Sequence, residues 1–250
     1  MLTEQRFKKI VAMVNEKKSA SVQELMELLD ASESTIRRDL GILDEKGQLT
    51  KVRGGAIALS SDFHTTDAAV IIRKDRNKED KIKIARYAAS LITANDFVYL
   101  DAGTTTELMI DYITAKNVTF VTNAVGHAKK LSGKGYTTFI LGGEFKDKTE
   151  AIVGCEALES LEKYNFVKGF WGTNGASLEC GFTTPDLKEA LVKKKAMEHS
   201  RERFVLCDAS KIGAVSSVTF GEFDTAKIIT TQVHDAVYCE CDNILEVECL

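Results

Sequence analysis

From about residue 77 onward, short uninterrupted apolar runs alternate with segments of helical periodicity, and this alternation limits the folds open to the chain. A strand that is apolar at every position is buried on both faces, which is typical of parallel sheets covered by helices. The pattern predicts an α/β domain with a mostly parallel sheet. The six runs are Phe97–Leu100, Val118–Val121, Thr137–Leu141, Phe166–Trp171, Phe204–Cys207 and Lys227–Ile229.

The first 46 residues have a different pattern, which predicts three short helices. An apolar stripe at helical spacing runs from Phe7 to Val14. Ser21 and Glu24 have the spacing of a capping box and precede a second stripe. Ser32 is a good N-cap for a third helix, which follows after a tight turn.

A short β-hairpin is predicted after the third helix, because residues 49–53 alternate in polarity and precede two glycines. Three helices, with a tight turn between the second and third, and a following hairpin describe a winged helix-turn-helix. We therefore predict a DNA-binding head of residues 1–56, a linker of residues 57–76 and an α/β domain of residues 77–250.

The net charge of −4 at first argues against a nucleic-acid partner, because DNA-binding proteins usually present a basic surface. Residues 1–60, however, carry ten Lys or Arg and nine Asp or Glu, a net charge of +1, which leaves −5 for the remainder. Any basic surface in the head is therefore small and local.

Small polar and cationic side chains open the third helix, at the end that enters a major groove first. Arg can bond guanine bidentately, while Ser, Thr and helix N-termini hold phosphate. The alternative is that these side chains form the solvated face of a small bundle. The candidate DNA-contacting residues are Ser21, Ser32, Ser34, Thr35, Arg37, Arg38, Lys51, Arg53 and Gly54.

Small or polar residues also follow the predicted strands. Ligands of open α/β sheets bind outside the carboxyl ends of the strands, so we expect these loops to converge on one site. Gly103 and the three threonines after it suit a phosphate group, although a plain helix cap is the alternative. Asp101, Asn123 and Asn174 are candidates for binding sugar hydroxyls, and Lys211 for pairing with phosphate.

The head resembles the helix-turn-helix of the DeoR family of bacterial transcription regulators. The similarity is carried by Arg6, SESTIRRDL (residues 32–40), Leu43 and KVRGGA (residues 51–56). Arg53 stands where family members commonly have His before the two glycines, so positive charge is kept at this position.

The rest of the chain resembles the sugar-phosphate sensor domain of the same family, whose fold is similar to ribose-5-phosphate isomerase. The matching segments are DAGTTT (residues 101–106), VTNA (121–124), LGGE (141–144), Gly154, GTNG (172–175), GFTTPDLKEALVKKKAM (181–197) and DASKIG (208–213).

The resemblance implies a repressor that a sugar phosphate releases from its operator. The GTNG and GFTTPD segments, with Glu189 and Lys193, look closest to repressors of fructose operons, which implies fructose 1-phosphate as inducer; tagatose 6-phosphate or another sugar phosphate is the alternative. The candidate ligand residues are Asp101, Gly103, Thr104, Thr105, Thr106, Thr122, Asn123, Gly142, Gly143, Asn174, Gly175, Glu189, Lys193 and Lys211.

Two interpretations from other classes stay open. A sugar-phosphate isomerase or hydrolase with a DNA-binding head would find acid and base groups in Asp101, Asp186, Glu189, Asp208 and Lys211. The resemblance implies instead a domain that kept the pocket and lost turnover, so we expect no catalytic residues. The other interpretation is constitutive DNA binding with an α/β domain that only oligomerises.

The expected partners are double-stranded operator DNA, a sugar phosphate and further copies of the chain. Operators are usually palindromic, which predicts a dimer or tetramer. No cofactor or metal is expected, because the six cysteines lack the spacing of a zinc site. No apolar run approaches the roughly 18 residues of a membrane span, and the N-terminus lacks a signal peptide, so we expect a cytoplasmic protein with reduced cysteines and no membrane partner.

Overall fold

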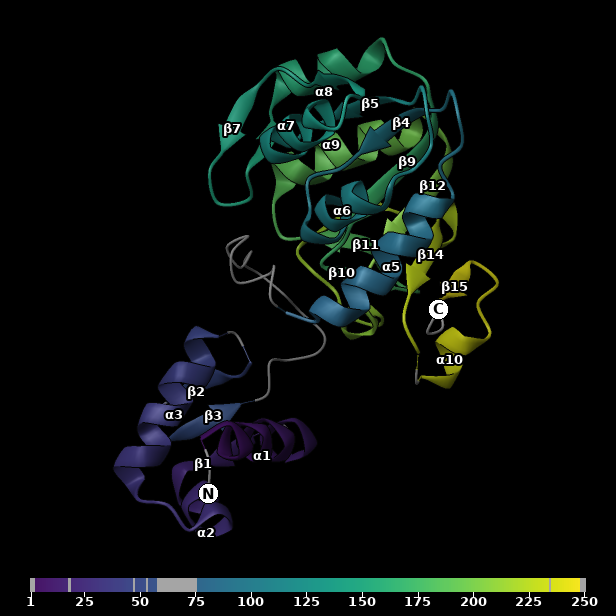
Figure 1. Ribbon diagram of the computed structural model, residues 1–250. Helices are drawn as coiled ribbons and strands as arrows, with labels where there is room; N and C mark the ends of the chain where they lie inside the picture. Colours follow the sequence, from purple (N-terminus) through teal and green to yellow (C-terminus); the bar gives the residue numbers. More distant parts are fainter. Residues whose placement is uncertain are drawn as a thin grey trace. The chain divides into compact units, whose positions relative to one another are not determined.

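The computed structural model describes residues 3–17, 19–46, 48–52, 54–57, 76–233 and 235–247. The chain divides into two compact units, Met1–Ser61 and Asp62–Leu250, which we call the head unit and the sheet unit (Figure 1). The segment predicted as a linker, residues 57–76, lies almost wholly outside the described residues, so the predicted boundaries stay a prediction.

The head unit contains the three predicted helices and the predicted hairpin. The helices are α1 (Thr3–Lys17), α2 (Val22–Leu29) and α3 (Glu33–Glu45), and the hairpin is formed by β2 (Thr50–Val52) and β3 (Gly55–Ile57). A third strand, β1 (Ser19–Ser21), was not predicted from the sequence; it pairs antiparallel with β3 in a sheet of order β1-β3-β2. Gly55 permits this pairing, since a Cβ there would lie 2.2 Å from the Ala20 carbonyl oxygen.

Apolar stripes of the three helices form the core of the head unit, with Ile10, Leu25, Ile36 and Leu40 almost fully buried. The predicted capping box starts α2: the Ser21 hydroxyl accepts from the Glu24 N–H, and the Glu24 carboxylate accepts from the Ser21 N–H. Local sequence therefore sets where α2 begins.

An ion pair joins α1 to α3 beside this core. The Arg6 guanidinium donates to both carboxylate oxygens of Asp39, with an Nη2 to Oδ1 distance of 3.1 Å. The Asp39 side chain is fully buried, and 11% of the Arg6 side chain is exposed. A buried carboxylate is stable only when paired, so this contact constrains the position of α3 against α1.

The sheet unit is built on the predicted parallel sheet. Its seven strands pair only in parallel, in the order β15-β14-β12-β9-β4-β5-β6. All six predicted runs contribute a strand, and only β15 was not anticipated. The strands are β4 (Phe97–Leu100), β5 (Thr119–Thr122), β6 (Thr137–Ile140), β9 (Phe166–Gly172), β12 (Ser200–Leu206), β14 (Lys227–Thr230) and β15 (Ile244–Glu246).

Helices cover both faces of this sheet, as continuous apolar strands require (Figure 1). On β4, Val98 and Leu100 pack in one cluster with Ile84, whereas Tyr99 packs in the opposite cluster with Ala190. The first face is covered by α5 (Lys78–Ser90), α6 (Thr104–Met109) and α7 (Val125–Gly133), and the second by α8 (Cys155–Glu162) and α9 (Leu187–Glu198).

Smaller elements complete the sheet unit. A second sheet, of order β10-β11-β13, packs on the α9 side, and β7 pairs antiparallel with β8. The bounds are β7 (Glu144–Lys146), β8 (Ala151–Val153), β10 (Gly175–Ser177), β11 (Gly181–Thr184), β13 (Val218–Gly221), α10 (Ala236–Cys239) and the 3-10 turns η1 (Ile110–Tyr112), η2 (Ala209–Lys211) and η3 (Phe223–Thr225).

Replacement of Asp39 by Asn tests the ion pair between α1 and α3. The change leaves the Arg6 charge without its partner, so we expect the head unit to lose about 3 kcal/mol of stability. Hydrogen exchange of the full-length chain, read on peptides from α1 and α3, should show opening about a hundredfold more often. Lys8→Ala, on the exposed side of α1, is the control and should exchange as the wild type does; equal protection in Asp39→Asn would show that the pair is dispensable.

Candidate DNA-binding surface and ligand site

The N-terminus of α3 carries a cluster of hydroxyls. Ser32 is the N-cap, and its hydroxyl accepts from the Thr35 N–H at 3.4 Å. The same Ser32 oxygen lies 3.1 Å from the Ser34 hydroxyl and 2.9 Å from the Thr35 hydroxyl. Ser34 is exposed and Thr35 half-buried, so the cluster is accessible at the helix end that the sequence assigns to DNA.

Both candidate arginines of α3 are exposed. Arg37 Nε donates to Glu33 Oε1 at 2.7 Å, one helical turn away. An exposed ion pair of this kind contributes little, so the Arg37 guanidinium can leave it for a base edge at small cost. The geometry is therefore compatible with base contact by Arg37.

Lys51, predicted to contact phosphate, also ties the hairpin to α3. Its backbone N–H donates to Asp44 Oδ1 at 3.0 Å, and its ammonium donates to the Arg37 carbonyl oxygen at 3.2 Å. The ammonium has three N–H donors, so phosphate binding by Lys51 would be additional to this bond. Among the other candidates, Ser21 caps α2, Gly54 is exposed with a φ of 96°, and Arg53 lies outside the described residues.

The centre of the predicted ligand site is a buried ion pair between Asp101, directly after β4, and Lys193 on α9. The Lys193 ammonium donates to Asp101 Oδ2 and, at 3.1 Å, to the carbonyl oxygen of Gly172. The Gly172 N–H, at the end of β9, donates to the same Asp101 oxygen at 3.2 Å. The other oxygen, Asp101 Oδ1, is buried without a hydrogen-bond partner among the described residues.

The ionisation of Asp101 reflects these surroundings. Burial raises the pKa of Asp101, although Lys193 and the Gly172 N–H favour the charged form. The negative charge of Glu189 adds to the upward shift. An unpaired carboxylate oxygen at this depth is a strong acceptor for any donor that a ligand brings.

The loop after β4 is held by side chains that the sequence assigned to ligand binding. The Thr106 hydroxyl bonds the Asp101 carbonyl at 2.7 Å and lies 3.1 Å from Nε2 of His127 on α7. Asn123 Oδ1, after β5, accepts from the Ala102 N–H at 2.8 Å. Thr106 and Asn123 therefore shape the loop around Asp101, and ligand contact by either would be additional to that role.

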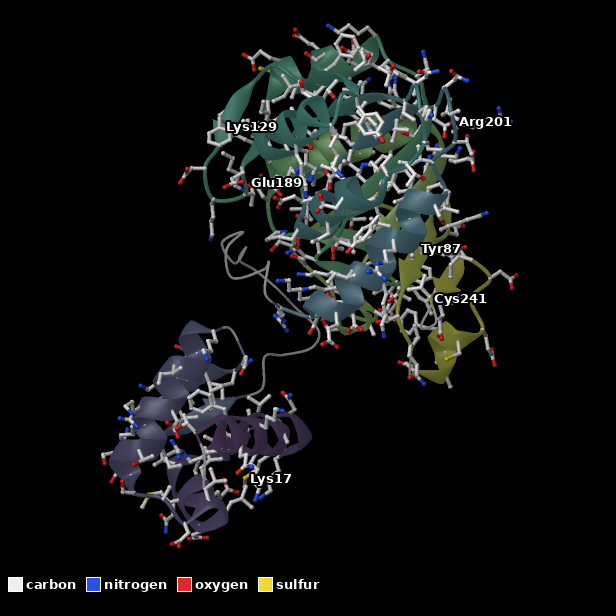
Figure 2. The ribbon with its side chains drawn as sticks, in the orientation of Figure 1. Lys17, Tyr87, Lys129, Glu189, Arg201 and Cys241 are labelled. Carbon is white, nitrogen blue, oxygen red and sulfur yellow. The ribbon has the colours of Figure 1, made fainter. Side chains whose placement is uncertain are left out.

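Glu189 lies one helical turn before Lys193 on α9, and it receives two donors that the sequence did not single out. Lys146 on β7 lies 2.8 Å from Glu189 Oε1, and the Thr149 hydroxyl donates to the same oxygen at 2.6 Å. Lys146 also pairs with Asp186 at 2.9 Å. In Figure 2 the labelled Glu189 lies near β7, the strand that supplies Lys146.

Lys146 keeps its charge in this setting. Burial lowers its pKa, but the bonds to Glu189 and Asp186 outweigh that effect, so the pKa of Lys146 is raised. The sequence carried no local signal for Lys146 or Thr149, because both lie in an excursion beyond the end of β6 and meet α9 only through tertiary packing.

The remaining candidates are distributed along the same edge of the sheet. Thr122 and Asn174 are tied by side-chain bonds to the Ala124 N–H and the Thr184 hydroxyl. Gly143 has a φ of 139°, and a Cβ at Gly143 or Gly175 would lie within 2.5 Å of a carbonyl oxygen. Thr104 and Thr105 are buried in the first turn of α6, Gly103 precedes them, Gly142 is exposed after β6, and Lys211 lies in η2 after β12.

The site therefore combines carboxylates with lysines that compensate them. This arrangement suits a ligand rich in hydroxyl groups, because each carboxylate is held in place while retaining acceptor capacity. Within the described residues, no group of three or more His, Cys, Asp or Glu side chains is placed to hold a metal ion. No helix in the described part of the chain is long and apolar enough to cross a membrane.

Known proteins resemble the chain over nearly its whole length. A regulator named FruR from Bacillus subtilis (strain 168), described as an uncharacterized HTH-type transcriptional regulator, is 43% identical over 239 residues, which cover 95% of this chain and 94% of that protein. A lactose phosphotransferase system repressor from Staphylococcus epidermidis is 34% identical over 233 residues, covering 92% of each chain.

A solved structure of ribose 5 phosphate isomerase A from Neisseria gonorrhoeae has a TM-score of 0.41 at 15% identity, covering 55% of this chain and 54% of that one. At this score the likeness supports no conclusion about activity. The relatives above are regulators, so the isomerase-like enzyme considered from the sequence is set aside in favour of a transcriptional regulator.

Family models divide the chain in the same way as the structure. The DeoR-like helix-turn-helix domain matches residues 6–62, and the DeoR C terminal sensor domain matches residues 76–232. The chain therefore belongs to the DeoR family of transcriptional regulators, with a DNA-binding helix-turn-helix in its head unit and the family's sensor domain in its sheet unit.

Proposed function

We propose that this protein represses a sugar-utilisation operon, and that a sugar phosphate bound at the carboxyl edge of the parallel sheet releases it from operator DNA. The observation that carries the proposal is Asp101, whose Oδ1 is buried without a hydrogen-bond partner among the described residues while Oδ2 is held by Lys193. Such an acceptor favours a ligand that donates hydroxyls.

Fructose 1-phosphate is the effector that we favour. The name FruR of the 43% identical relative supports it, as do the segments around Glu189 and Lys193. Tagatose 6-phosphate or a similar sugar phosphate is the alternative, since a relative at 34% identity is named for another sugar, as a lactose phosphotransferase system repressor. In both cases we place the hydroxyls at Asp101, and the phosphate near Gly103 and Lys211.

Release requires the effector to distinguish two states of the protein. To change the ratio of the released state to the DNA-binding state from 1:99 to 99:1, the effector must bind the released state more tightly by about 5.5 kcal/mol. Several sensor domains in one oligomer can supply this together, and a palindromic operator requires an even number of heads. We therefore propose a cytoplasmic dimer or tetramer whose heads fit the operator only without effector.

A direct test selects operators from a random DNA library with the full-length protein and then titrates the bound complex with sugar phosphates. We expect fructose 1-phosphate to dissociate the complex in a gel shift and to raise the melting temperature of the protein. Selection of no preferred sequence would contradict the repressor, and retention of DNA with every sugar phosphate would contradict the effector. Turnover of a sugar phosphate by the purified protein would contradict a purely regulatory role.

Replacing Arg37 and Arg53 separately should divide base reading from phosphate binding. Arg37→Ala should reduce the preference for operator over random DNA by about 1–3 kcal/mol, because a bidentate contact to a base is lost. Arg53→Ala should weaken binding to all sequences and reduce the salt dependence by about one unit. Fluorescence anisotropy at several salt concentrations measures both, and unchanged sequence preference in Arg37→Ala would contradict the groove assignment.

Asp101→Asn should separate effector sensing from DNA binding. The change keeps the shape of the side chain but leaves the Lys193 charge unpaired, so we expect the sheet unit to lose stability. At a temperature where the variant is folded, the operator affinity should stay the same and the effector affinity should fall about tenfold or more. Calorimetry and gel shifts measure the two quantities. Asp111→Asn, at an exposed carboxylate that pairs with Lys130, is the matched control. Normal release of Asp101→Asn by the effector would exclude this role of Asp101.

A further inference from the structure

The two strands β7 and β8 form an arm, residues 144–153, that reaches from the sheet edge to α9. At its base the Ile152 N–H donates to the Asn123 carbonyl at 2.6 Å, and Ala151 forms an isolated antiparallel bridge with Ala124. Gly143 permits the close approach of the arm's two strands, since a Cβ there would lie 2.5 Å from the Val153 carbonyl oxygen. The arm therefore starts beside the loop that follows β5, at the same edge as Asp101.

Polar contacts attach the arm to the first turn of α9. Lys146 reaches Glu189 Oε1 and Asp186, and the Thr149 hydroxyl donates to Glu189 Oε1. A further pair, Lys188 with Glu144, lies on the outside, where both side chains are more than half exposed. Only the Lys146 and Thr149 contacts involve a buried carboxylate, because just 9% of the Glu189 side chain is exposed.

Asp101 and Glu189 are arranged in the same way. Each carboxylate has one oxygen bound by a buried or half-buried lysine, Lys193 for Asp101 and Lys146 for Glu189. Asp101 Oδ1 makes no hydrogen bond within the described residues, and the Lys146 and Thr149 contacts to the Glu189 carboxylate both go to Oε1, which leaves Oε2 to face a ligand. Glu189 and Lys193 are four residues apart on α9, so their Cβ atoms are about 5–6 Å apart.

We infer that these two oxygens accept two hydroxyls from the sugar portion of the effector, and that Lys146 and Thr149 are positioning residues that hold Glu189 for this contact. The inference rests on the proposed function and deepens it, because it assigns the arm to recognition of the hydroxyl pattern. Lys146 and Lys193 offset two of the three negative charges of Asp101, Asp186 and Glu189, so an anionic sugar phosphate approaches a net charge of −1 and not −3.

The test compares Lys146→Met with the wild type in calorimetric titrations of the full-length protein. The probes are fructose 1-phosphate, deoxy analogues that each lack one hydroxyl, and inorganic phosphate. We expect the wild type to bind one or two deoxy analogues about tenfold more weakly than fructose 1-phosphate. Lys146→Met should bind fructose 1-phosphate about tenfold more weakly than the wild type does. For one of the deoxy analogues that the wild type binds weakly, the affinity of Lys146→Met should be nearly the same as its affinity for fructose 1-phosphate, because the contact to the missing hydroxyl is already lost.

Three further variants define the role. Lys146→Arg keeps the charge and should recover part of the affinity, while Thr149→Val keeps the shape and should lose several-fold. Lys188→Met removes the exposed contact between the arm and α9 and should behave like the wild type. All variants should bind operator DNA normally without effector, which shows that the fold is intact.

The outcomes separate this inference from the proposed function. If the wild type binds and responds to fructose 1-phosphate, but Lys146→Met and Thr149→Val have wild-type affinity, the inference is wrong and the proposed function stands. The inference is also wrong if Lys146→Met binds fructose 1-phosphate more weakly but still distinguishes it from every deoxy analogue by the same factors as the wild type. If tagatose 6-phosphate binds instead, its own deoxy analogues replace the first set; if no sugar phosphate binds the wild type, both proposals fall.

Discussion

The buried ion pair between Asp101 and Lys193 is the contact on which the functional edge of the sheet unit depends. It joins the loop after β4 to α9, and through Gly172 it includes the end of β9. Two charges at this depth are tolerated only when their geometry is good and further hydrogen bonds satisfy them. The Gly172 N–H and carbonyl supply those bonds, which leaves one oxygen of Asp101 as the unsatisfied group of the arrangement.

The parallel sheet was predictable because its signal is local. A run such as Phe97–Leu100 is apolar at every position, and this alone requires cover on both faces. The carboxyl ends of parallel strands meet at one edge, so Asp101 and Asn123 were placed in one region without any knowledge of their contacts. The strands β1 and β15 escaped prediction because each has three residues and neither is marked by a neighbouring turn signal such as the two glycines of the β2–β3 hairpin.

The details of the site were less predictable, because hydrogen bonding is decided by tertiary packing. Thr106 has the residue type of a phosphate ligand, but its hydroxyl is hydrogen-bonded to the Asp101 carbonyl and lies 3.1 Å from Nε2 of His127. Lys51 has the charge of a phosphate contact, yet its ammonium reaches the Arg37 carbonyl. Lys146 carried no motif at all, and only the folded arm brings it to Glu189. Residue type thus indicates the chemistry that is available, and packing decides which part of it remains free.

Charge compensation would reconcile the acidic sensor domain with the sugar phosphate that we propose as its effector. Residues 61–250 carry a net charge of −5, which by itself repels a sugar phosphate. Local compensation reduces that repulsion, since Lys193 pairs with Asp101, Lys146 is shared between Glu189 and Asp186, and each lysine contacts only one oxygen of a carboxylate. The carboxylates of Asp101 and Glu189 therefore act as oriented acceptors more than as free charges. A site of this kind selects a ligand by the positions of its hydroxyls, and such selection can distinguish one sugar phosphate from another when all carry the same phosphate group.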